Sequence, residues 1–415
     1  MAALCLMGEF VKALRSDQET RVRILFSGNP LVGHLLPMMP LAAAGRAARH
    51  ETALLTSGEA SLVAPVRLLH AGPSIEEMVD ETDRRIGSHP SEPGPEMARW
   101  AAELFAGVRV EWSFDEALRQ VGTFGPDLVV CEGHDFVGPM VAAALGVPWA
   151  EHAVMGPLPK PFWQTMHERV AREYRSRSLT AMPRIAVVDP YPDALRWSTE
   201  QPPADRITIR PAVNEYGPAQ HAEPDLRPEH PCALVTLGTI VNHGVALSAL
   251  ASSVAAAGFT AIVTAQRQDL SADIDSDRVR PVGFVPLAKL LPQVDVVVTA
   301  GGTGTVLASL SRGLPMVIRP FVADQPRNAA RLAFRGAAIV IDDVAEAGTA
   351  ARLIADNRAY REVAQGMAAE LACLNSPDTV LHRLIVRAAM SWDSGRSSKP
   401  APLIEKGESS RRSLM

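Results

Sequence analysis

Two short glycine-containing loops carry the residues whose types and spacing are best suited to chemistry. The first reads FSGNPLVGHLLP and sets Gly28 and His34 in the pattern G-x-x-x-x-G-H. A phosphate-binding P-loop has a lysine and then a hydroxyl residue after its second glycine, whereas this loop has His34 and Leu35. An imidazole with a pKa near ~6.5 is mostly unprotonated at neutral pH and can accept a proton. The role of His34 stays open at this point between acid–base chemistry and a histidine that caps a helix or is satisfied in the core.

The second loop, TAGGTGTVLASLSRGLP, follows an apolar run and opens a helical one. Gly301, Gly302 and Gly304 allow the backbone to approach a ligand closely, and the hydroxyls of Thr303 and Thr305 lie among them. A helix N-terminus carries about half a positive charge, so an anion such as a diphosphate is suited to this position. The alternative is a tight turn without a ligand.

A third candidate is the segment FVADQPRNAARLA, which follows the apolar run PMVIRP. It places Asp324 and Gln325 at the end of a predicted strand. A carboxylate beside an amide offers both acceptors and donors to sugar hydroxyls. The alternative is that Asp324 only caps the helix that Asn328 and Arg331 begin.

The surrounding segments predict an α/β protein with two doubly wound parallel sheets. Apolar runs at 21–27, 51–58, 126–133 and 147–153 alternate with helical segments, and 34–50 reads as one helix. The alternation restarts with runs at 232–239, 259–266, 294–301 and 314–320. It indicates parallel sheets covered by helices on both faces. Ligands bind beyond the carboxyl ends of such strands, so two facing domains would form a cleft lined by both sets of loops.

Composition divides the chain into five predicted parts. They are an N-terminal extension (1–20), a first Rossmann-like domain (21–211), a proline-rich linker (212–230), a second Rossmann-like domain (231–391) and a polar tail expected to be disordered (392–415). The charged segment 80–97, rich in proline and glycine, is predicted to be a mobile loop.

Length, composition and net charge favour a soluble globular protein of two domains. The 415 residues exceed the usual size of one core, and the net charge of −5, without a basic cluster, argues against nucleic acid as a partner. Cysteines 5, 131, 232 and 373 are far apart, which argues against a disulfide framework or a zinc site and fits the cytoplasm. No apolar run approaches the ~20 residues that span a bilayer, so stable membrane insertion is not expected.

The combined motifs resemble a known family. AGGTGT, GLP and ADQPRNAARL are similar to the donor-binding motif of the GT-B, family 1 glycosyltransferases, above all the bacterial branch that attaches deoxysugars to antibiotics. RILFSGNPLVGHLLPMMPLA resembles that branch's N-terminal signature, and CALVTLGT resembles the strand that opens its C-terminal domain. The resemblance runs from Arg21 to Ala389. It implies inverting, metal-independent transfer of a sugar from a nucleotide donor to a hydroxyl of a hydrophobic aglycone, in natural-product biosynthesis.

The resemblance also implies roles for individual residues. His34 would be the general base and Glu132, at the family's aspartate position, would orient it; His134 and Asp135 are rivals for that second role, and Glu132 could instead be a solvated strand end. The donor-binding residues would be Thr239, Val285, Gly301, Gly302, Thr303, Gly304, Thr305, Asp324 and Gln325. Candidates for the acceptor pocket are Phe136, Trp149, Met155, Phe162 and Trp163, although such residues are as typical of a core.

One position departs from the family pattern. The family has a histidine directly before the glycine pair, where this chain has Ala300. A charged hydrogen bond is worth roughly 1.5–3 kcal/mol, so its loss would weaken donor binding about ten- to a hundredfold. Arg267 and Arg319 are candidates to compensate. No cofactor or metal is expected, and the co-substrate is predicted to be a dTDP-sugar rather than a UDP-sugar.

Two other functions stay open at this point. A nucleotide-sugar epimerase can share the architecture, although the G-H-x-x-P element argues against it. A degenerate, non-catalytic partner protein is suggested by Ala300, although His34, Asp324 and Gln325 are retained. A Rossmann dehydrogenase is disfavoured because neither loop matches G-x-G-x-x-G in the first strand–helix turn. The oligomeric state is open, with a homodimer among the alternatives.

Overall fold

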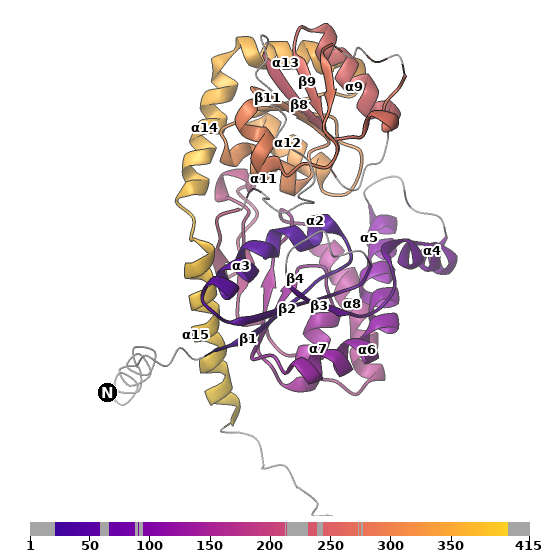
Figure 1. The fold of residues 1–415 in the computed structure, drawn as a ribbon. Coiled ribbons are helices and arrows are strands. Elements are labelled where there is room, and N and C mark those ends of the chain that lie inside the picture. The colour runs from indigo at the N-terminus through magenta and orange to yellow at the C-terminus, as the bar shows by residue number, and fades with distance from the viewer. Residues whose placement is uncertain are drawn as a thin grey trace, which may run out of the picture.

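The computed structural model describes residues 21–58, 66–87, 90, 94–211, 213, 231–238, 244–272, 274 and 277–396. Within these ranges the chain forms two lobes, each built on a parallel sheet (Figure 1). This confirms the predicted α/β class with two Rossmann-like sheets. The predicted N-terminal extension, all of the predicted linker except Val213, and residues 397–415 lie outside the described residues.

The first described sheet has seven strands in the order β3-β2-β1-β4-β5-β6-β7. The strands are β1 (Arg23–Ser27), β2 (Glu51–Thr56), β3 (Arg67–His70), β4 (Leu128–Glu132), β5 (Trp149–His152), β6 (Val187–Asp189) and β7 (Arg206–Thr208). Strand β4 is buried along its whole length, as its apolar run predicts for a strand covered on both faces. The strand order reverses between β1 and β4, so their carboxyl ends mark the position where such sheets bind ligands.

The helix expected over 34–50 is divided in the structure. It begins as α2 (Val32–Leu35), continues as the 3-10 turn η1 (Leu36–Met38) and ends as α3 (Met39–Ala47). Pro37 and Pro40 cause the division, because proline has no N–H to donate to the preceding turn. The other helical elements of this lobe are α4 (Ile75–Ile86), α5 (Pro95–Ala102), the π-helix η3 (Glu103–Val108), α6 (Arg109–Phe124), α7 (Val137–Leu145), α8 (Lys160–Ser176) and the 3-10 turn η4 (Asp193–Leu195).

The prediction of a mobile loop over 80–97 was wrong for most of that segment. Residues 80–86 belong to α4 and residues 95–97 to α5, while 88, 89 and 91–93 lie outside the described residues. Helix α4 is stabilised by a capping box between Ser74 and Glu77. Ion pairs of Glu81 with Arg84 and Arg85 support the last turn.

The second described sheet repeats the same order in six strands, β10-β9-β8-β11-β12-β13. They are β8 (Cys232–Thr236), β9 (Thr260–Val263), β10 (Val279–Pro281), β11 (Val296–Thr299), β12 (Met316–Ile318) and β13 (Ala338–Val340). The helices around it are α9 (Gly244–Ala256), α10 (Leu287–Leu290), α11 (Thr303–Ser311), α12 (Gln325–Arg335), α13 (Ala347–Asp356) and α14 (Arg358–Ala372), with short turns η5 (Arg267–Asp269), η6 (Leu291–Gln293) and η7 (Val344–Glu346).

Helix α15 (Pro377–Arg396) leaves the second lobe and runs along the first, as the yellow ribbon in Figure 1 shows. Its residues Val380, Leu381 and Leu384 are buried in the same apolar cluster as Ile24 and Phe26 of β1. The end of the predicted second domain therefore belongs to the core of the first. The helix also continues to Arg396, so the predicted tail starts inside it.

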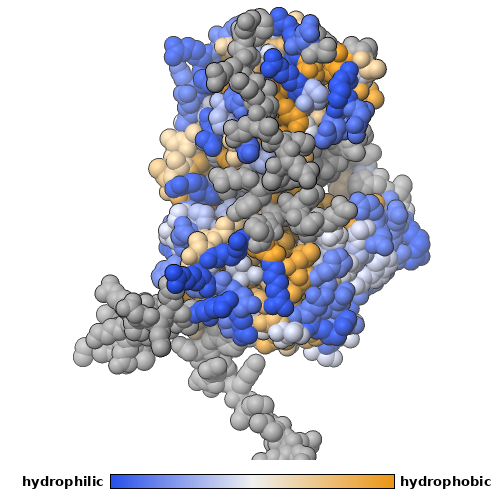
Figure 2. Space-filling view, in the orientation of Figure 1, coloured by the Kyte–Doolittle hydropathy of each residue, from blue (hydrophilic) through white to orange (hydrophobic). Residues whose placement is uncertain are grey.

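Hydrophilic side chains cover much of the visible face of both lobes (Figure 2). Among the described residues, no helix has the length and apolar character that crossing a membrane requires. Cys131, Cys232 and Cys373, the cysteines that the structure describes, are all free.

The return of α15 predicts that truncating Leu384, which is fully buried, destabilises the first lobe. We expect Leu384→Ala to cost about 2–5 kcal/mol, because it leaves a cavity in a packed cluster. Met390→Ala on the same helix is the control, since Met390 is 61% exposed. Thermal unfolding should show a clear fall in midpoint for the first variant alone; equal shifts for both would contradict the packing.

Candidate functional site

The loop after β1 turns tightly against the end of β4. A Cβ built on Gly28 would lie 2.7 Å from Cδ2 of Leu35 and 3.1 Å from Cγ of Glu132. A side chain at position 28 would therefore push α2 away from β4. Without one, the chain enters α2, where the His34 amide donates to the carbonyl of Leu31.

His34 and Glu132 meet at the point where the first sheet's strand order reverses. The Nδ1 atom of His34 lies 3.0 Å from Oε1 of Glu132, the last residue of β4. The Glu132 side chain is fully buried and that of His34 is 9% exposed. An ionised carboxylate can only accept a hydrogen bond, so Nδ1 carries the proton and the lone pair is on Nε2.

Two further groups hold the Glu132 carboxylate. Nδ2 of Asn29 donates to Oε1 at 2.5 Å, and the His134 amide donates to Oε2 at 2.7 Å. Asn29 Nδ2 also donates to the carbonyl of His134 at 2.9 Å. Asn29 was not among the predicted site residues, although its position two residues after β1 is a signal that could have found it.

The pKa values of His34 and Glu132 are shifted in opposite directions: that of His34 is raised and that of Glu132 is lowered. Burial lowers the pKa of His34, but the charge and hydrogen bond of Glu132, with a further contribution from Asp324, raise it overall. Burial raises the pKa of Glu132, but the charge of His34 and the nearby His134 outweigh burial and hold the pKa well below its usual range. Glu132 is therefore ionised at neutral pH, as an orienting partner must be.

The rivals of Glu132 have other partners. Asp135 accepts hydrogen bonds from Ser27 Oγ at 2.5 Å and from the amides of Val137 and Gly138, so it holds the start of α7. The Nδ1 atom of His134 is buried, has no hydrogen bond to any residue that the structure describes, and lies 3.8 Å from Glu132 Oε2. Of these three residues, Glu132 is the one bonded to the His34 ring.

His34, Glu132 and His134 also form a group that could chelate a metal, since their ligand atoms lie within 4.8 Å of one another. Glu132, however, already accepts hydrogen bonds from Asn29, His34 and the His134 amide. A metal would have to displace these donors. The geometry fits a hydrogen-bonded network better than a metal centre.

Aromatic side chains surround this network on one side. The ring of His134 lies 5.0 Å from that of Trp163 and 6.2 Å from that of Phe162, both on α8. Phe105 lies 5.8 Å from His34 and 5.9 Å from His134. Phe162 and Trp163 were predicted; Phe105 was missed because nothing in its sequence context distinguishes it from a packed helical residue.

The other acceptor candidates are placed differently. Phe136 is part of the first lobe's buried apolar cluster, and Trp149 packs against that cluster while its Nε1 donates to the carbonyl of Met182. Met155 is half-buried in the segment after β5. For Phe136 and Trp149 the core interpretation is therefore the better one.

The second glycine loop leads into the N-terminus of helix α11. Gly301 has φ of 90°, and a Cβ there would lie 2.8 Å from Cγ2 of Ile318. Gly302 is the N-cap of α11, so the amides of Thr303, Gly304 and Thr305 have no partner within the helix. A Cβ built on Gly302 or Gly304 would meet no atom of the described residues within 4 Å.

Asp324 occupies part of this site. Its Oδ2 accepts hydrogen bonds from the amide of Thr303 at 3.0 Å and from its hydroxyl at 2.6 Å. Asp324 is the N-cap residue of α12 by position, but its side chain makes no capping bond there. Gln325 likewise turns inward, because its Oε1 accepts from the amides of Phe321 and Val322. One side-chain oxygen of Asp324 and the side-chain oxygen of Gln325 are thus already hydrogen-bonded within the protein.

Two of the predicted donor-binding residues lie outside the glycine loop and the Asp324 segment. Thr239 lies outside the described residues. Val285 is buried in the second lobe's apolar cluster, whereas the neighbouring Phe284 is 40% exposed. If this segment contacts a nucleoside base through a side chain, Phe284 is the better placed residue.

Each of the two predicted compensators for Ala300 makes hydrogen bonds close to its own position in the chain. The Ala300 side chain is buried in an apolar cluster of the second lobe. The guanidinium of Arg267 donates to the carbonyls of Ser271 and Ala272, and that of Arg319 donates to Pro320 and stacks over Phe321. Both guanidinium groups are thus bonded within their own segments.

The two glycine loops belong to facing ends of the two lobes. Figure 1 shows α2 on the side of the lower lobe that faces α11 and α12 of the upper lobe. The electrostatic effect of Asp324 on the pKa of His34 is a second sign of this proximity.

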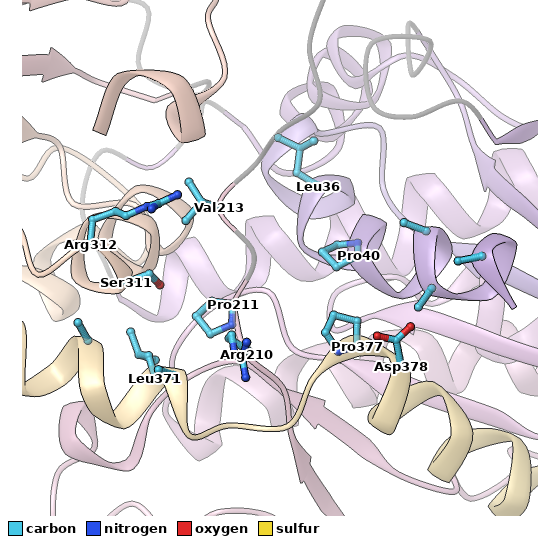
Figure 3. A pocket seen from close by; sticks show the side chains of 15 residues that line it. Leu36, Pro40, Arg210, Pro211, Val213, Ser311, Arg312, Leu371, Pro377 and Asp378 are labelled. Carbon is cyan, nitrogen blue, oxygen red and sulfur yellow. The ribbon is translucent and has the colours of Figure 1, made fainter. Parts of the chain in front are cut away.

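A separate cavity of about 730 Å³ lies where the lobes join (Figure 3). It is lined by residues of η1, α3, the end of α11 and helices α14 and α15, and by Arg210, Pro211 and Val213. None of the predicted site residues is among its lining, so the proposed chemistry does not use it.

Comparison with solved structures identifies the class of protein. The chain superposes on the glycosyltransferase SsfS6 of Streptomyces sp. SF2575, crystallised with thymidine diphosphate, with a TM-score of 0.75 and 28% identity over 88% of this chain and 100% of that one. SnogD from Streptomyces nogalater has the same fold, with a TM-score of 0.73, 24% identity and coverage of 89% and 100%. The protein is a GT-B glycosyltransferase.

Sequence comparison narrows the class to a family. Residues 247–386 match the model of the erythromycin biosynthesis protein CIII-like C-terminal domain. The L-demethylnoviosyl transferase of Streptomyces niveus is 30% identical over 390 residues, covering 88% of this chain and 97% of that protein. The elloramycin glycosyltransferase ElmGT of Streptomyces olivaceus is 29% identical over 88% and 97%. The chain belongs to this family of glycosyltransferases of antibiotic biosynthesis, as the motifs predicted.

The His34–Glu132 bond predicts a measurable dependence of one pKa on the other residue. Neutralising Glu132 leaves the effect of burial, which lowers the pKa of His34. We expect Glu132→Gln to lower the His34 pKa relative to the wild type, as followed by NMR of labelled histidine, with His34→Ala assigning the signal. Asp127→Asn, just before the opposite end of β4, should leave it unchanged. An equal or higher His34 pKa in Glu132→Gln would contradict the pairing.

Proposed function

We propose that this protein catalyses inverting transfer of a deoxysugar from a dTDP donor to a hydroxyl of a hydrophobic small molecule. The observation that carries the proposal is the buried His34–Glu132 bond at the switch point of one sheet, facing a helix N-terminus at the switch point of the other. The first supplies a proton acceptor and the second a site for a diphosphate.

In this proposal, His34 removes the proton from the acceptor hydroxyl through Nε2. Glu132 stabilises the imidazolium that forms and keeps the ring in place. The acceptor oxygen attacks the anomeric carbon from the face opposite the diphosphate, the new C–O bond forms, and the bond between that carbon and the diphosphate oxygen breaks. The configuration at the anomeric carbon is thereby inverted.

The leaving diphosphate would be stabilised by α11. The amides of Gly304 and Thr305, together with the positive end of the helix, replace the charge that a metal ion would otherwise supply. Thr303 is shared with Asp324, so its amide is less free to bind phosphate.

The sugar would lie between the two loops. Asp324 keeps Oδ1 for a sugar hydroxyl while Oδ2 stays on Thr303, and Gln325 keeps its amide nitrogen while Oε1 stays on the loop. Phe105, Phe162 and Trp163 would contact the apolar acceptor beside His34. A base aimed at a separate acceptor favours transfer over epimerisation, which needs no acceptor.

The base assignment predicts the behaviour of His34→Ala. We expect its turnover to fall about 100- to 10,000-fold, the usual range for loss of general-base catalysis, while the Kd for dTDP changes less than about twofold. His70→Ala, an exposed histidine at the end of β3, is the control. Near-native transfer by His34→Ala, measured by product mass spectrometry, would overturn the assignment.

The donor assignment is tested by calorimetry with free nucleotides. The support for dTDP is that the related SsfS6 was crystallised with thymidine diphosphate. We expect dTDP to bind more tightly than UDP or GDP, by about tenfold or more if the thymine ring is recognised. Equal binding of the three, or preference for UDP, would contradict the dTDP assignment.

A further inference from the structure

Tyr191 belongs to the first lobe by sequence but is buried in the second. It follows β6, yet its side chain, only 1% exposed, lies in the apolar cluster around α12. Leu195 of η4 joins the same cluster. The first lobe thus inserts a segment against the helix that begins at the donor loop.

The buried cation Arg331 of α12 is held by first-lobe groups. One nitrogen, Nη2, donates to Glu200 at 2.5 Å and to the carbonyl of Pro157 at 3.3 Å, and Nη1 donates to the Tyr191 hydroxyl at 3.3 Å. Gly156 makes room for this contact, since a Cβ there would lie 2.7 Å from the Tyr191 ring.

Asn328 connects Tyr191 to the donor loop. Its Oδ1 accepts from the Tyr191 hydroxyl at 3.2 Å, and its Nδ2 lies 2.9 Å from the carbonyl of Gly301, 3.0 Å from Thr303 Oγ1 and 2.9 Å from Asp324 Oδ2. A carbonyl and a carboxylate can only accept, so Nδ2 must face them and Oδ1 must face Tyr191. The amide therefore has one orientation, and Tyr191 is the donor to it.

The loop that Asn328 contacts is conformationally demanding. Ala323, directly before Asp324, has φ of 58°, a region that residues other than glycine seldom adopt. Such a backbone persists only where its surroundings hold it. The bond from Asn328 to Asp324 is one of those constraints.

We propose that Tyr191 is a positioning residue for the donor site, acting from the other lobe through Asn328 on Asp324 and the start of α11. The proposal rests on the function proposed above and adds the dependence of donor binding on a first-lobe hydroxyl. Burial raises the pKa of Tyr191 to about 12, so the hydroxyl remains a donor at physiological pH.

The test is dTDP calorimetry on Tyr191→Phe, which keeps the ring and removes one hydroxyl. We expect the dTDP Kd to rise about five- to thirtyfold, because Asn328 loses its donor and no longer holds the loop as firmly. The KM for the donor should rise in parallel, with kcat at saturating donor changed less than about threefold. Tyr174→Phe on α8 is the matched control and should bind dTDP like the wild type.

A double variant distinguishes an effect that passes from the Tyr191 hydroxyl through Asn328, here called the relay, from an effect of the packing of Tyr191. In an Asn328→Ser background, adding Tyr191→Phe should change the Kd by less than about twofold, because the connecting group is already gone. The proposal is overturned if Tyr191→Phe binds dTDP like the wild type, whatever its thermal midpoint, or if its effect persists undiminished in Asn328→Ser. Failure of the wild type to bind dTDP would instead overturn the proposed donor site, and the relay with it.

Discussion

The buried carboxylate of Glu132 is the constraint on which the first lobe's site depends. An ionised carboxylate inside a protein is costly unless its oxygens are hydrogen-bonded. Here the donors come from Asn29, His34 and the His134 amide, so the loop after β1 and the end of β4 are tied together. The bonds that make the charge tolerable are the same ones that orient the imidazole. Loss of one of them would therefore affect stability and chemistry together.

The two lobes share one sheet topology but place different chemical groups at its switch point. Both sheets reverse their strand order at the same relative position, and both place a glycine loop there. In the first lobe that point holds an imidazole and a carboxylate; in the second it presents helix amides. The segment around Tyr191, bonded to Asn328, and helix α15, packed on β1 and α3, join the lobes so that these unlike sites face each other.

Much of this could be predicted from sequence because it depends on local pattern. Alternating apolar and helical runs predicted both sheets. The pairing of His34 with Glu132 was implied by the family resemblance, which left His134 and Asp135 as rivals. What the sequence could not show were contacts between segments far apart in the chain: Phe105 beside His34, Asp324 on Thr303, and α15 in the first lobe's core. The helix over 75–86 could have been predicted, because its capping box, Ser74 with Glu77, is a local sequence pattern.

A crystal structure with dTDP bound would show whether α11 and His34 address one reaction centre from opposite lobes. We expect the diphosphate on the amides of Gly304 and Thr305, with its outer phosphate toward His34 and the His34–Glu132 bond intact. A diphosphate bound elsewhere, or a His34 ring turned away from it, would contradict this arrangement.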